Sequence, residues 1–263
     1  MIFLQSIFDF HVHVFPDNVA ERATENLHTY YKVPMASTGT WAEFLKSSAE
    51  NPQIKKCLIH STATRPSQVV AVNTFLSGII NDDLLGFGTV HPDFEDIEGE
   101  IDRLITLGLR GIKLHPDFQQ FEADSEKACR IYKYAEGKLP VLFHAGDKNV
   151  NTSSPKRIRH IHDMFPRLTI IAAHMGGYSA WDEAEKYLVG TDVFFDTSST
   201  TMFFPPEKMA KMIREHGAHK CLFGTDFPMH DRAEEIKRML ALGLSDEEYK
   251  MIFWDNAVRL LGL

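Results

Sequence analysis

The sequence predicts an α/β protein in which eight parallel strands close into a single (β/α)8 TIM barrel. Short apolar segments rich in β-branched and aromatic residues recur along the 263 residues, and amphipathic stretches with helix signals separate most of them. Such an alternation predicts a parallel sheet, and about eight units of roughly 30 residues match a closed barrel. The first strand segment ends in Phe-His-Val-His-Val-Phe without glycine, whereas an open doubly wound sheet normally places a glycine-rich phosphate loop there.

The predicted strands are short and almost continuously apolar, as buried parallel strands are. In chain order they are residues 7–14, 56–60, 84–90, 109–114, 140–143, 168–173, 192–195 and 220–223. Residues 16–51 exceed a simple crossover, and we expect them to hold one or two helices over the barrel mouth. Because no linker or low-complexity segment interrupts the pattern, we expect residues 1–263 to form one domain.

Four of the expected helices carry end signals, which are capping residues at the N-terminus or a glycine after the C-terminus. The signals are Gly108 after residues 96–107, Ser125 before a helix that ends at Gly137, Ser154 followed by Pro155, and Ser245 with Glu248 in a capping box.

The amino-acid composition limits which binding partners and which cellular compartment we expect for the protein. A formal net charge of -8 disfavours nucleic acid, because phosphate binding needs a basic face. No run approaches the roughly 18 apolar residues of a membrane span, so we expect no membrane partner. Residues 1–15 make a poor signal peptide, since they lack a basic region. The three cysteines show no Cys-x-x-Cys spacing, which argues against a thiolate zinc site. We expect a cytoplasmic protein, and a homodimer on base rates alone.

Ionisable side chains stand at or just beyond the C-terminal end of most predicted strands. They are His11, His13, His60, His91, Lys113, His115, His144, His174, Asp196 and Asp226. One such histidine is usually a hydrogen-bonded structural residue, but placement at nearly every strand is hard to ascribe to chance. In a barrel these ends converge on the face that carries active sites.

The segment Asp-Phe-His-Val-His at residues 9–13 is the strongest single motif. Side chains alternate along a strand, so His11 and His13 point the same way and can share one metal ion. Two buried imidazoles without partners would be costly, and a metal removes that cost. The competing interpretation is a hydrogen-bonded pair in the core.

We expect one divalent ion, with Zn²⁺ as the first choice and Mn²⁺ as the alternative, held by His11, His13, His144 and Asp226. The competing interpretation of Asp226 is a helix N-cap. His174 could be a further nitrogen ligand. We instead assign it a catalytic role with Asp226, either polarising a substrate carbonyl or moving a proton.

The other polar residues near strand ends are expected to bind a small-molecule substrate. They are Lys113, His115, His91, His60 and Arg65. Lys113 could instead be carbamylated and bridge two metal ions, and the sequence leaves this alternative open. Arg65 and Lys148 follow strand ends and could bind an anionic group, with a solvated loop charge as the competing interpretation.

Together these motifs resemble the amidohydrolase superfamily, and more narrowly its amidohydrolase-related branch, which is related to aminocarboxymuconate-semialdehyde decarboxylase. The likeness rests on the His-x-His pair, His144, His174 and Asp226, on Gly-Ile-Lys-Leu-His-Pro at 111–116, Ala-His-Met-Gly-Gly at 173–177, Gly-Thr-Asp-Phe-Pro at 224–228 and Asn-Ala-Val-Arg-Leu-Leu at 256–261. The resemblance implies a metallo-dependent hydrolase barrel with one metal, often zinc, at the four ligand positions given above, and a catalytic residue at His174. The branch includes hydrolases, decarboxylases and hydratases, so fold and metal site carry over better than the reaction.

The leading functional hypothesis is hydrolysis of a small-molecule ester, lactone or amide by a metal-activated water. Asp226 would take the proton of that water, and His174 would stabilise the oxyanion. The alternative is a non-oxidative decarboxylase acting on a carboxylated ring or enol. A cavity lined by an arginine and aromatic side chains beside the metal would favour that alternative, whereas the short chain weighs against it. A third hypothesis is a barrel that binds a ligand without turnover.

Overall fold

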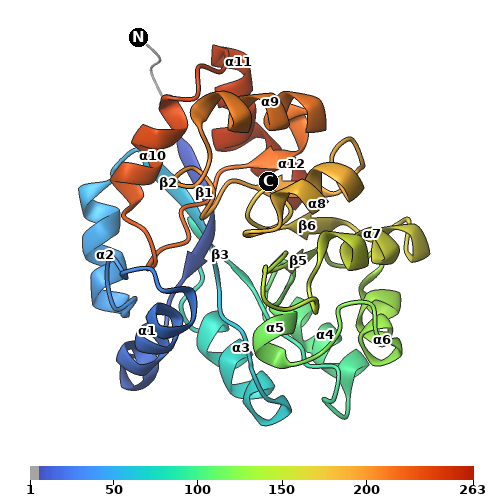
Figure 1. Cartoon of the computed structure of the whole chain (residues 1–263). Helices are drawn as coiled ribbons and strands as arrows, with labels where there is room; N and C mark the ends of the chain where they lie inside the picture. Colours follow the sequence, from blue (N-terminus) through green and yellow to red (C-terminus); the bar gives the residue numbers. More distant parts are fainter. Residues whose placement is uncertain (1–5) are drawn as a thin grey trace.

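The computed structural model describes residues 6–263 (Figure 1). Residues 1–5, which open the segment judged a poor signal peptide, lie outside the described residues. The strands are β1 Ile7–His13, β2 Ile54–His60, β3 Leu84–Phe87, β4 Ile112–Leu114, β5 Val141–Phe143, β6 Ile170–Ala172, β7 Phe194–Asp196 and β8 Cys221–Leu222. Each overlaps one of the predicted strand segments, so the strand predictions are confirmed.

The strands form a closed parallel ring. β1 to β3 pair in chain order, and β4 to β8 pair in chain order as a second set. Two parallel bridges join the sets, one between Gly88 and Ile112 and one between Val12 and Phe227. A 2.7 Å hydrogen bond from the His13 N–H to the Phe227 carbonyl reinforces the second junction. The predicted (β/α)8 barrel is confirmed.

Helices surround the ring on the outside (Figure 1). They are α1 Asp17–Tyr31, α2 Trp41–Glu50, α3 Val69–Ser77, α4 Ile97–Thr106, α5 Pro116–Gln119, α6 Glu126–Ala135, α7 Pro155–Met164, α8 Trp181–Tyr187, α9 Pro206–His216, α10 Arg232–Leu240, α11 Asp246–Lys250 and α12 Asn256–Leu261, with short turns η1 Pro66–Gln68, η2 Ala218–Lys220 and η3 Met251–Asp255. Within residues 6–263, no helix is both long enough and apolar enough to cross a membrane.

The expected helix signals mostly act as caps. Ser125 accepts a hydrogen bond from the Ala128 N–H, and Ser245 forms a capping box with Glu248. Ser154 occupies the N-cap position before α7, but its side chain makes no capping hydrogen bond. Helices α1 and α2 fill the long stretch after β1, as expected, and α1 contributes to the walls of the cavity described below.

A bulge in β1 separates the packed interior from the mouth. Phe8 and Phe10 belong to the hydrophobic cluster that fills the barrel, whereas Val12 belongs to the outer core beneath the helices. The pairing of β1 with β2 shifts between Asp9 and Val12. Bulges re-aim side chains next to active sites, and this shift lets one strand supply both interior packing and the His-x-His pair at the mouth.

Candidate active site and metal centre

A cavity of about 680 Å³ opens where the carboxyl ends of the strands meet α1. Polar residues predicted from the strand ends contribute to its lining, namely His11, His13, Lys113, His115, His144, His174 and Asp226. Aromatic side chains form much of the rest, namely Phe15, Tyr30, Tyr31, Phe75, Phe118 and Tyr178. The structure therefore gathers polar groups from strands far apart in sequence beneath an aromatic wall.

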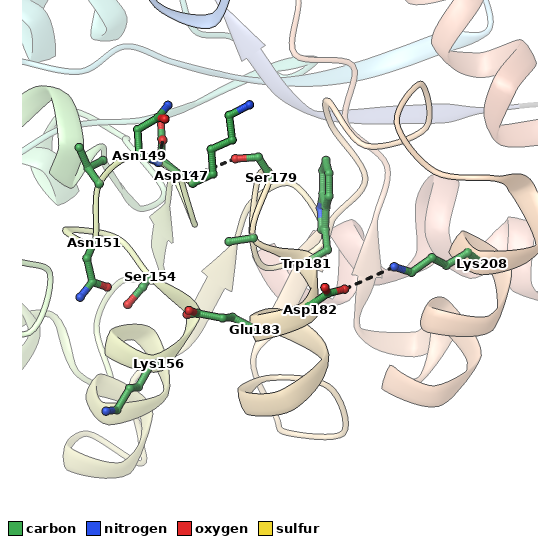
Figure 2. A pocket seen from close by; sticks show the side chains of 13 residues that line it. Asp147, Asn149, Asn151, Ser154, Lys156, Ser179, Trp181, Asp182, Glu183 and Lys208 are labelled. Carbon is green, nitrogen blue, oxygen red and sulfur yellow. Dashed lines mark hydrogen bonds and ion pairs between the residues drawn. The ribbon is translucent and has the colours of Figure 1, made fainter.

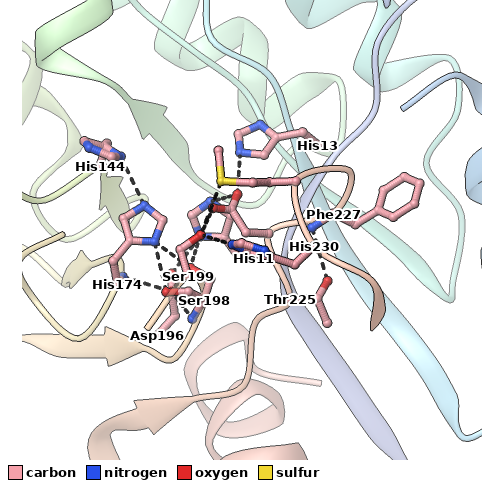
Figure 3. Close-up of polar contacts among 12 residues, drawn as sticks. His11, His13, His144, His174, Asp196, Ser198, Ser199, Thr225, Phe227 and His230 are labelled. Carbon is pink, nitrogen blue, oxygen red and sulfur yellow. Dashed lines mark hydrogen bonds and ion pairs between the residues drawn. The ribbon is translucent and has the colours of Figure 1, made fainter. Parts of the chain in front are cut away.

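His11 is buried at the centre of this arrangement (Figure 3). Its Nδ1 lies 2.8 Å from Oδ2 of Asp196, at the end of β7. Burial acts to raise the pKa of Asp196, but His11 and Ser198 outweigh it and hold the pKa far below its ordinary value. Because a carboxylate only accepts, Nδ1 carries the hydrogen and the Nε2 lone pair is left for another partner. Metal-binding histidines are commonly oriented by a carboxylate in this way.

Asp226 faces both histidines of the β1 motif. Its Oδ1 lies 3.5 Å from His11 Nε2 and 3.3 Å from His13 Nε2, and its Oδ2 accepts a 2.5 Å hydrogen bond from the Ser199 hydroxyl. Burial acts to raise the pKa of Asp226, but the neighbouring histidines hold it well below its ordinary value. Asp226 does not cap a helix, because Asp231 caps α10.

The backbone of Asp226 is held in a conformation that side chains rarely adopt. Its φ is 59°, and its N–H donates to the His11 carbonyl at 2.9 Å. His174 also has a φ of 59°. Left-handed non-glycine residues cluster at functional sites, where the surrounding structure compensates for the strain. Both residues assigned as catalytic from the sequence therefore share this feature.

His174 lies close to the same group. One of its ring nitrogens falls within 4.8 Å of ligand atoms of His11 and Asp226. Its Nδ1 faces the Ser198 carbonyl at 3.1 Å, and its Nε2 lies 3.1 Å from Nδ1 of His144 (Figure 3). Burial lowers the pKa of His174 to about 4, so the ring is neutral at pH 7.

His144 lies farther out than the sequence predicted for a metal ligand. Its ring stacks on His115 with centroids 3.9 Å apart, and its Nε2 lies 3.6 Å from Oδ2 of Asp117. The ligand group that contains His144 comprises His115 and Asp117 rather than His11. The structure thus brings His11, His13, His174 and Asp226 together, and the ligand role of His144 stays a prediction.

Lys113 places a cation on the cavity floor. Its side chain is buried, and its Nζ lies 3.4 Å from His11 Nε2. Burial lowers the pKa of Lys113 to about 8, although Asp196 and Asp226 act in the opposite direction. His115, the neighbour that shares its strand face, also lines the cavity, and its Nε2 lies 3.1 Å from the Tyr31 hydroxyl.

Three residues predicted to contact substrate are not among the side chains that line the cavity, so their substrate role stays a prediction. His91 follows β3, which ends at Phe87, and turns away so that its Nε2 meets the Gln119 carbonyl at 3.2 Å. Arg65 is exposed on the loop before η1. His60 is fully buried beside the β1 histidines and is out of reach of a molecule in the cavity.

Sequence reasoning missed several residues that support or line the site. Ser198 hydrogen-bonds Asp196 and His174, and Ser199 hydrogen-bonds Asp226. Arg22 of α1 is exposed and contributes to the cavity lining. The serines lie in the run Asp-Thr-Ser-Ser-Thr-Thr at residues 196–201, directly after β7. This run of small hydroxyl side chains directly after a buried strand could have indicated the two serines from the sequence. Arg22 carried no comparable signal.

A second cavity of about 590 Å³ lies beside the mouth, on the loops that follow β5 and β6 (Figure 2). Lys148 and Lys208 line this cavity, and Lys208 Nζ lies 3.6 Å from Oδ1 of Asp182. The strand-end histidines do not contribute to its lining. We therefore place the chemistry in the first cavity, and Lys148 outside it.

The donor set of the first cavity fits a divalent metal. Burial lowers the pKa values of His11 and His13, so both rings are neutral and keep a lone pair. The adjacent Asp226 is ionised. Imidazoles with one carboxylate suit zinc, manganese, iron or cobalt.

A comparison with models of protein families finds a match over most of the chain. Residues 75–263 match the model of a protein family described as Amidohydrolase. No curated protein matches the sequence.

Solved structures resemble the whole fold. 5-Carboxyvanillate decarboxylase from Sphingomonas paucimobilis has a TM-score of 0.75 at 15% identity, over 98% of this chain and 99% of that one. A dihydroxybenzoic acid decarboxylase from Polaromonas sp. JS666, with bound manganese and 2-nitroresorcinol, has a TM-score of 0.73 at 15% identity, over 98% and 97%. A probable 2-pyrone-4,6-dicarboxylic acid hydrolase from Acinetobacter baumannii has a TM-score of 0.69 at 16% identity, over 98% and 100%. At such identities the likeness concerns the fold.

Proposed function

Because the chain belongs to the amidohydrolase family, whose members are enzymes, we propose that it is a metal-dependent decarboxylase of a planar, carboxylated small molecule. The observation that carries this proposal is the cavity lining, which combines aromatic side chains with Arg22 and Lys113. We expected an arginine and aromatic side chains beside the metal to favour a decarboxylase over a hydrolase. Lys113 provides a cation beside the proposed ligand His11, and the exposed Arg22 provides one on α1. Two solved decarboxylases align over nearly their whole chains, so chain length no longer weighs against this activity.

The aromatic wall suits a flat substrate. Tyr31 packs edge-on against Tyr178 at a centroid distance of 5.2 Å and lies 5.9 Å from Phe118. Rings gain from offset or edge-to-face contacts with another ring. An aromatic acid packed against these side chains would turn its charged group toward a cation, and Lys113 on the floor provides one that is largely shielded from water.

His11, His13 and Asp226 are the residues that would hold the metal, while the facing nitrogens of His174 and His144 stay free to share a proton. When bound, a divalent ion supplies Lewis-acid stabilisation of negative charge on a substrate oxygen. Zinc and manganese both fit these donors, and manganese is bound in one structural relative.

Loss of carbon dioxide leaves an electron pair on carbon, which takes up one proton, so that R–CO₂⁻ and H⁺ become R–H and CO₂. The His174–His144 pair is placed to pass that proton on rather than to store it, because burial lowers the pKa values of both rings and keeps them neutral at pH 7. The outer nitrogens, His174 Nδ1 and His144 Nε2, each lie 3.1 Å from a backbone carbonyl, which can only accept. When both donate, the inner nitrogens are two lone pairs 3.1 Å apart, and one added proton bridges them. His174 then passes the proton toward the cavity, and Asp226 stays ionised beside it.

Hydrolysis of an ester, lactone or amide is the second candidate. One observation favours it, namely that the ionised Asp226 lies close to the neutral His174. Asp226 would take a proton from water, and His174 would stabilise a developing oxyanion once its Nε2 has gained the proton shared with His144. A planar lactone that carries carboxylates would fit the same cavity.

Product analysis distinguishes the two reactions. The metal-reconstituted enzyme would be incubated with hydroxybenzoates ¹³C-labelled in the carboxylate and with carboxylated lactones, and both gas and solution products would be measured by mass spectrometry. We expect labelled carbon dioxide in amounts equal to the substrate lost, and Lys113→Met should raise KM for these substrates. A ring-opened or cleaved product without carbon dioxide would replace decarboxylation by hydrolysis.

A further inference from the structure

His60 is a buried histidine whose ring has no hydrogen-bond partner. It is the last residue of β2 and is fully buried. Within residues 6–263, neither its Nδ1 nor its Nε2 meets a donor or an acceptor. Burying a polar group without a partner costs about 1–3 kcal/mol, and native structures rarely tolerate it. The described protein thus offers the His60 ring no hydrogen-bond partner, and we expect a bound ligand to provide one.

The surroundings of His60 restrict what that ligand can be. The residue does not line the cavity, so a substrate bound there does not reach it. Its two nearest aromatic contacts are His11 and His13, at centroid distances of 4.5 and 4.4 Å and nearly perpendicular to it. The missing partner must be small and must lie among imidazoles.

The three rings are spaced as ligands of one ion would be. His13 and His60 are register partners on β1 and β2, so the sheet itself fixes their separation. One ring nitrogen from each of His11, His13 and His60 falls within 4.8 Å of the other two. Metal-to-nitrogen bonds of about 2.0–2.1 Å place two ligand nitrogens within about 4 Å of each other, so small side-chain rotations close the set.

We propose that His60 is a third imidazole ligand of the divalent metal, beside His11 and His13. The inference rests on the metal-dependent function proposed above and adds a ligand from β2 to the four residues expected from the sequence. Coordination engages one of the two unpartnered nitrogens of His60. It also accounts for a histidine that neither substrate contact nor core hydrogen bonding explains.

The test compares the wild type with His60→Leu, using Co²⁺ as the probe after the native metal has been removed by chelation. We expect the variant to bind Co²⁺ at least about tenfold more weakly and with an altered visible absorption spectrum, because a nitrogen ligand is lost. The metal-free variant should melt no lower than the metal-free wild type, since leucine removes two unsatisfied nitrogens from the core.

His91→Leu is the matched control. His91 is also a buried histidine after a neighbouring strand, but its Nε2 meets the Gln119 carbonyl and its Nδ1 accepts from the Asp93 N–H at 3.1 Å. This variant should lower the melting temperature of the metal-free protein and leave Co²⁺ affinity and absorption unchanged.

The outcomes separate the two proposals. Unchanged Co²⁺ affinity and spectrum in His60→Leu, with a lower melting temperature, would overturn the ligand role and leave the metal-dependent function standing. Absence of Co²⁺ binding in the wild type would overturn both. Normal metal binding with neither carbon dioxide nor a hydrolytic product from the substrates above would count against the proposed function alone.

Discussion

Asp196 is the residue that fixes the orientation of His11. It accepts from His11 Nδ1 at 2.8 Å, and it also accepts from the backbone N–H groups of His174 and Ser198, each at 3.1 Å. One carboxylate thus positions a proposed metal ligand and the backbone of a proposed catalytic residue. Removing its charge would free the His11 ring to change tautomer without emptying the space that Asp196 fills.

Replacing Asp196 by Asn should weaken the binding of a divalent metal by roughly 10–100-fold, because an amide cannot hold His11 in the required tautomer as a carboxylate does. Isothermal titration of the metal-free protein with Mn²⁺ measures the change. Asp192→Asn, an exposed position next to the same strand, is the control and should bind as the wild type does. Equal affinities in both variants would contradict the orienting role.

His216 makes the fold sensitive to acid at a position away from the cavity. Its Nε2 donates to the Val193 carbonyl at 2.8 Å, and its Nδ1 accepts from the Gly190 N–H at 3.3 Å. Burial, aided by the nearby Lys220, lowers the pKa of His216 from 6.5 to about 4. Between these values the unfolded chain binds a proton that the folded chain does not, so the free energy of unfolding falls as the pH is lowered.

We expect the wild type to lose about 2 kcal/mol more stability than His216→Gln when the pH falls from 7 to 4.5. Urea unfolding curves at the two pH values give both differences. Above pH 7 the group contributes no pH dependence. If the variant loses as much stability as the wild type over the same range, protonation of His216 is not a source of acid instability.

At the scale of elements, the junction between β8 and β1 closes the ring and places Asp226 against His11. It depends on a close approach of two backbones. A β-carbon added to Gly224 would lie 2.7 Å from the β-carbon of His11 and 3.3 Å from that of Ser198. Neither neighbour is the far end of a flexible side chain, so the strands would have to separate.

Gly224→Ala should therefore destabilise the protein by about 1–3 kcal/mol and weaken metal binding, because His11 moves away from Asp226. Thermal unfolding and Mn²⁺ titration on the same preparation test both effects. Gly78→Ala, where the added atom meets only carbonyl oxygens at 3.4 and 3.6 Å, is the matched control. If Gly224→Ala lowers stability but leaves Mn²⁺ affinity unchanged, the junction between β8 and β1 does not position the metal site.

The elements were predictable from the sequence because their signals are local. Runs of buried β-branched residues marked the strands, and Ser125 and Ser245 marked helix starts. The bulge in β1 had no such signal, since it depends on pairing with β2. The same limit explains His91. Its place after a predicted strand suggested a cavity residue, but β3 ends four residues earlier, and His91 itself opens a turn that the Phe94 N–H closes on its carbonyl.

The site was predictable to the extent that it follows strand ends. His11, His13, His174 and Asp226 lie together because parallel strands in a barrel end on one face. The sequence could not tell that His144 stacks on His115, since ring orientation depends on neighbours from other strands. Nor could it place Arg22, because the position of α1 over the mouth follows from tertiary packing.

At the scale of the whole molecule, a buried ion pair joins β1, the first strand, to α10, the helix that follows β8. Arg232 of α10 donates to Oδ2 of Asp9 in β1 at 3.1 Å, and both side chains are fully buried. Arg232 also reaches the Ser48 hydroxyl of α2 at 3.0 Å. Asp9 in turn accepts from the N–H and hydroxyl of Thr225, which precedes Asp226. The closure of the barrel and the placement of the site thus share one polar network.

Arg232→Met should destabilise the protein by about 3–5 kcal/mol, because it leaves the Asp9 carboxylate buried without its cation. Adding Asp9→Asn should recover part of that loss by removing the charge. Lys237→Met on the same helix breaks only an exposed ion pair with Glu234 and should change stability by less than about 1 kcal/mol. Chemical unfolding of the four proteins tests the series, and a double variant no more stable than Arg232→Met would argue against a charge effect.

The central claim is that the barrel mouth is a metal centre built on His11, His13 and Asp226. The most direct measurement is competitive titration of the metal-free protein with Zn²⁺ and Mn²⁺, for the wild type and for His13→Ala. His13 is partly exposed, so its truncation opens toward the cavity and leaves the core intact. The account predicts binding by the wild type and a large loss of affinity in the folded variant. A folded wild type that binds neither ion, or a variant that binds as tightly as the wild type, would contradict it.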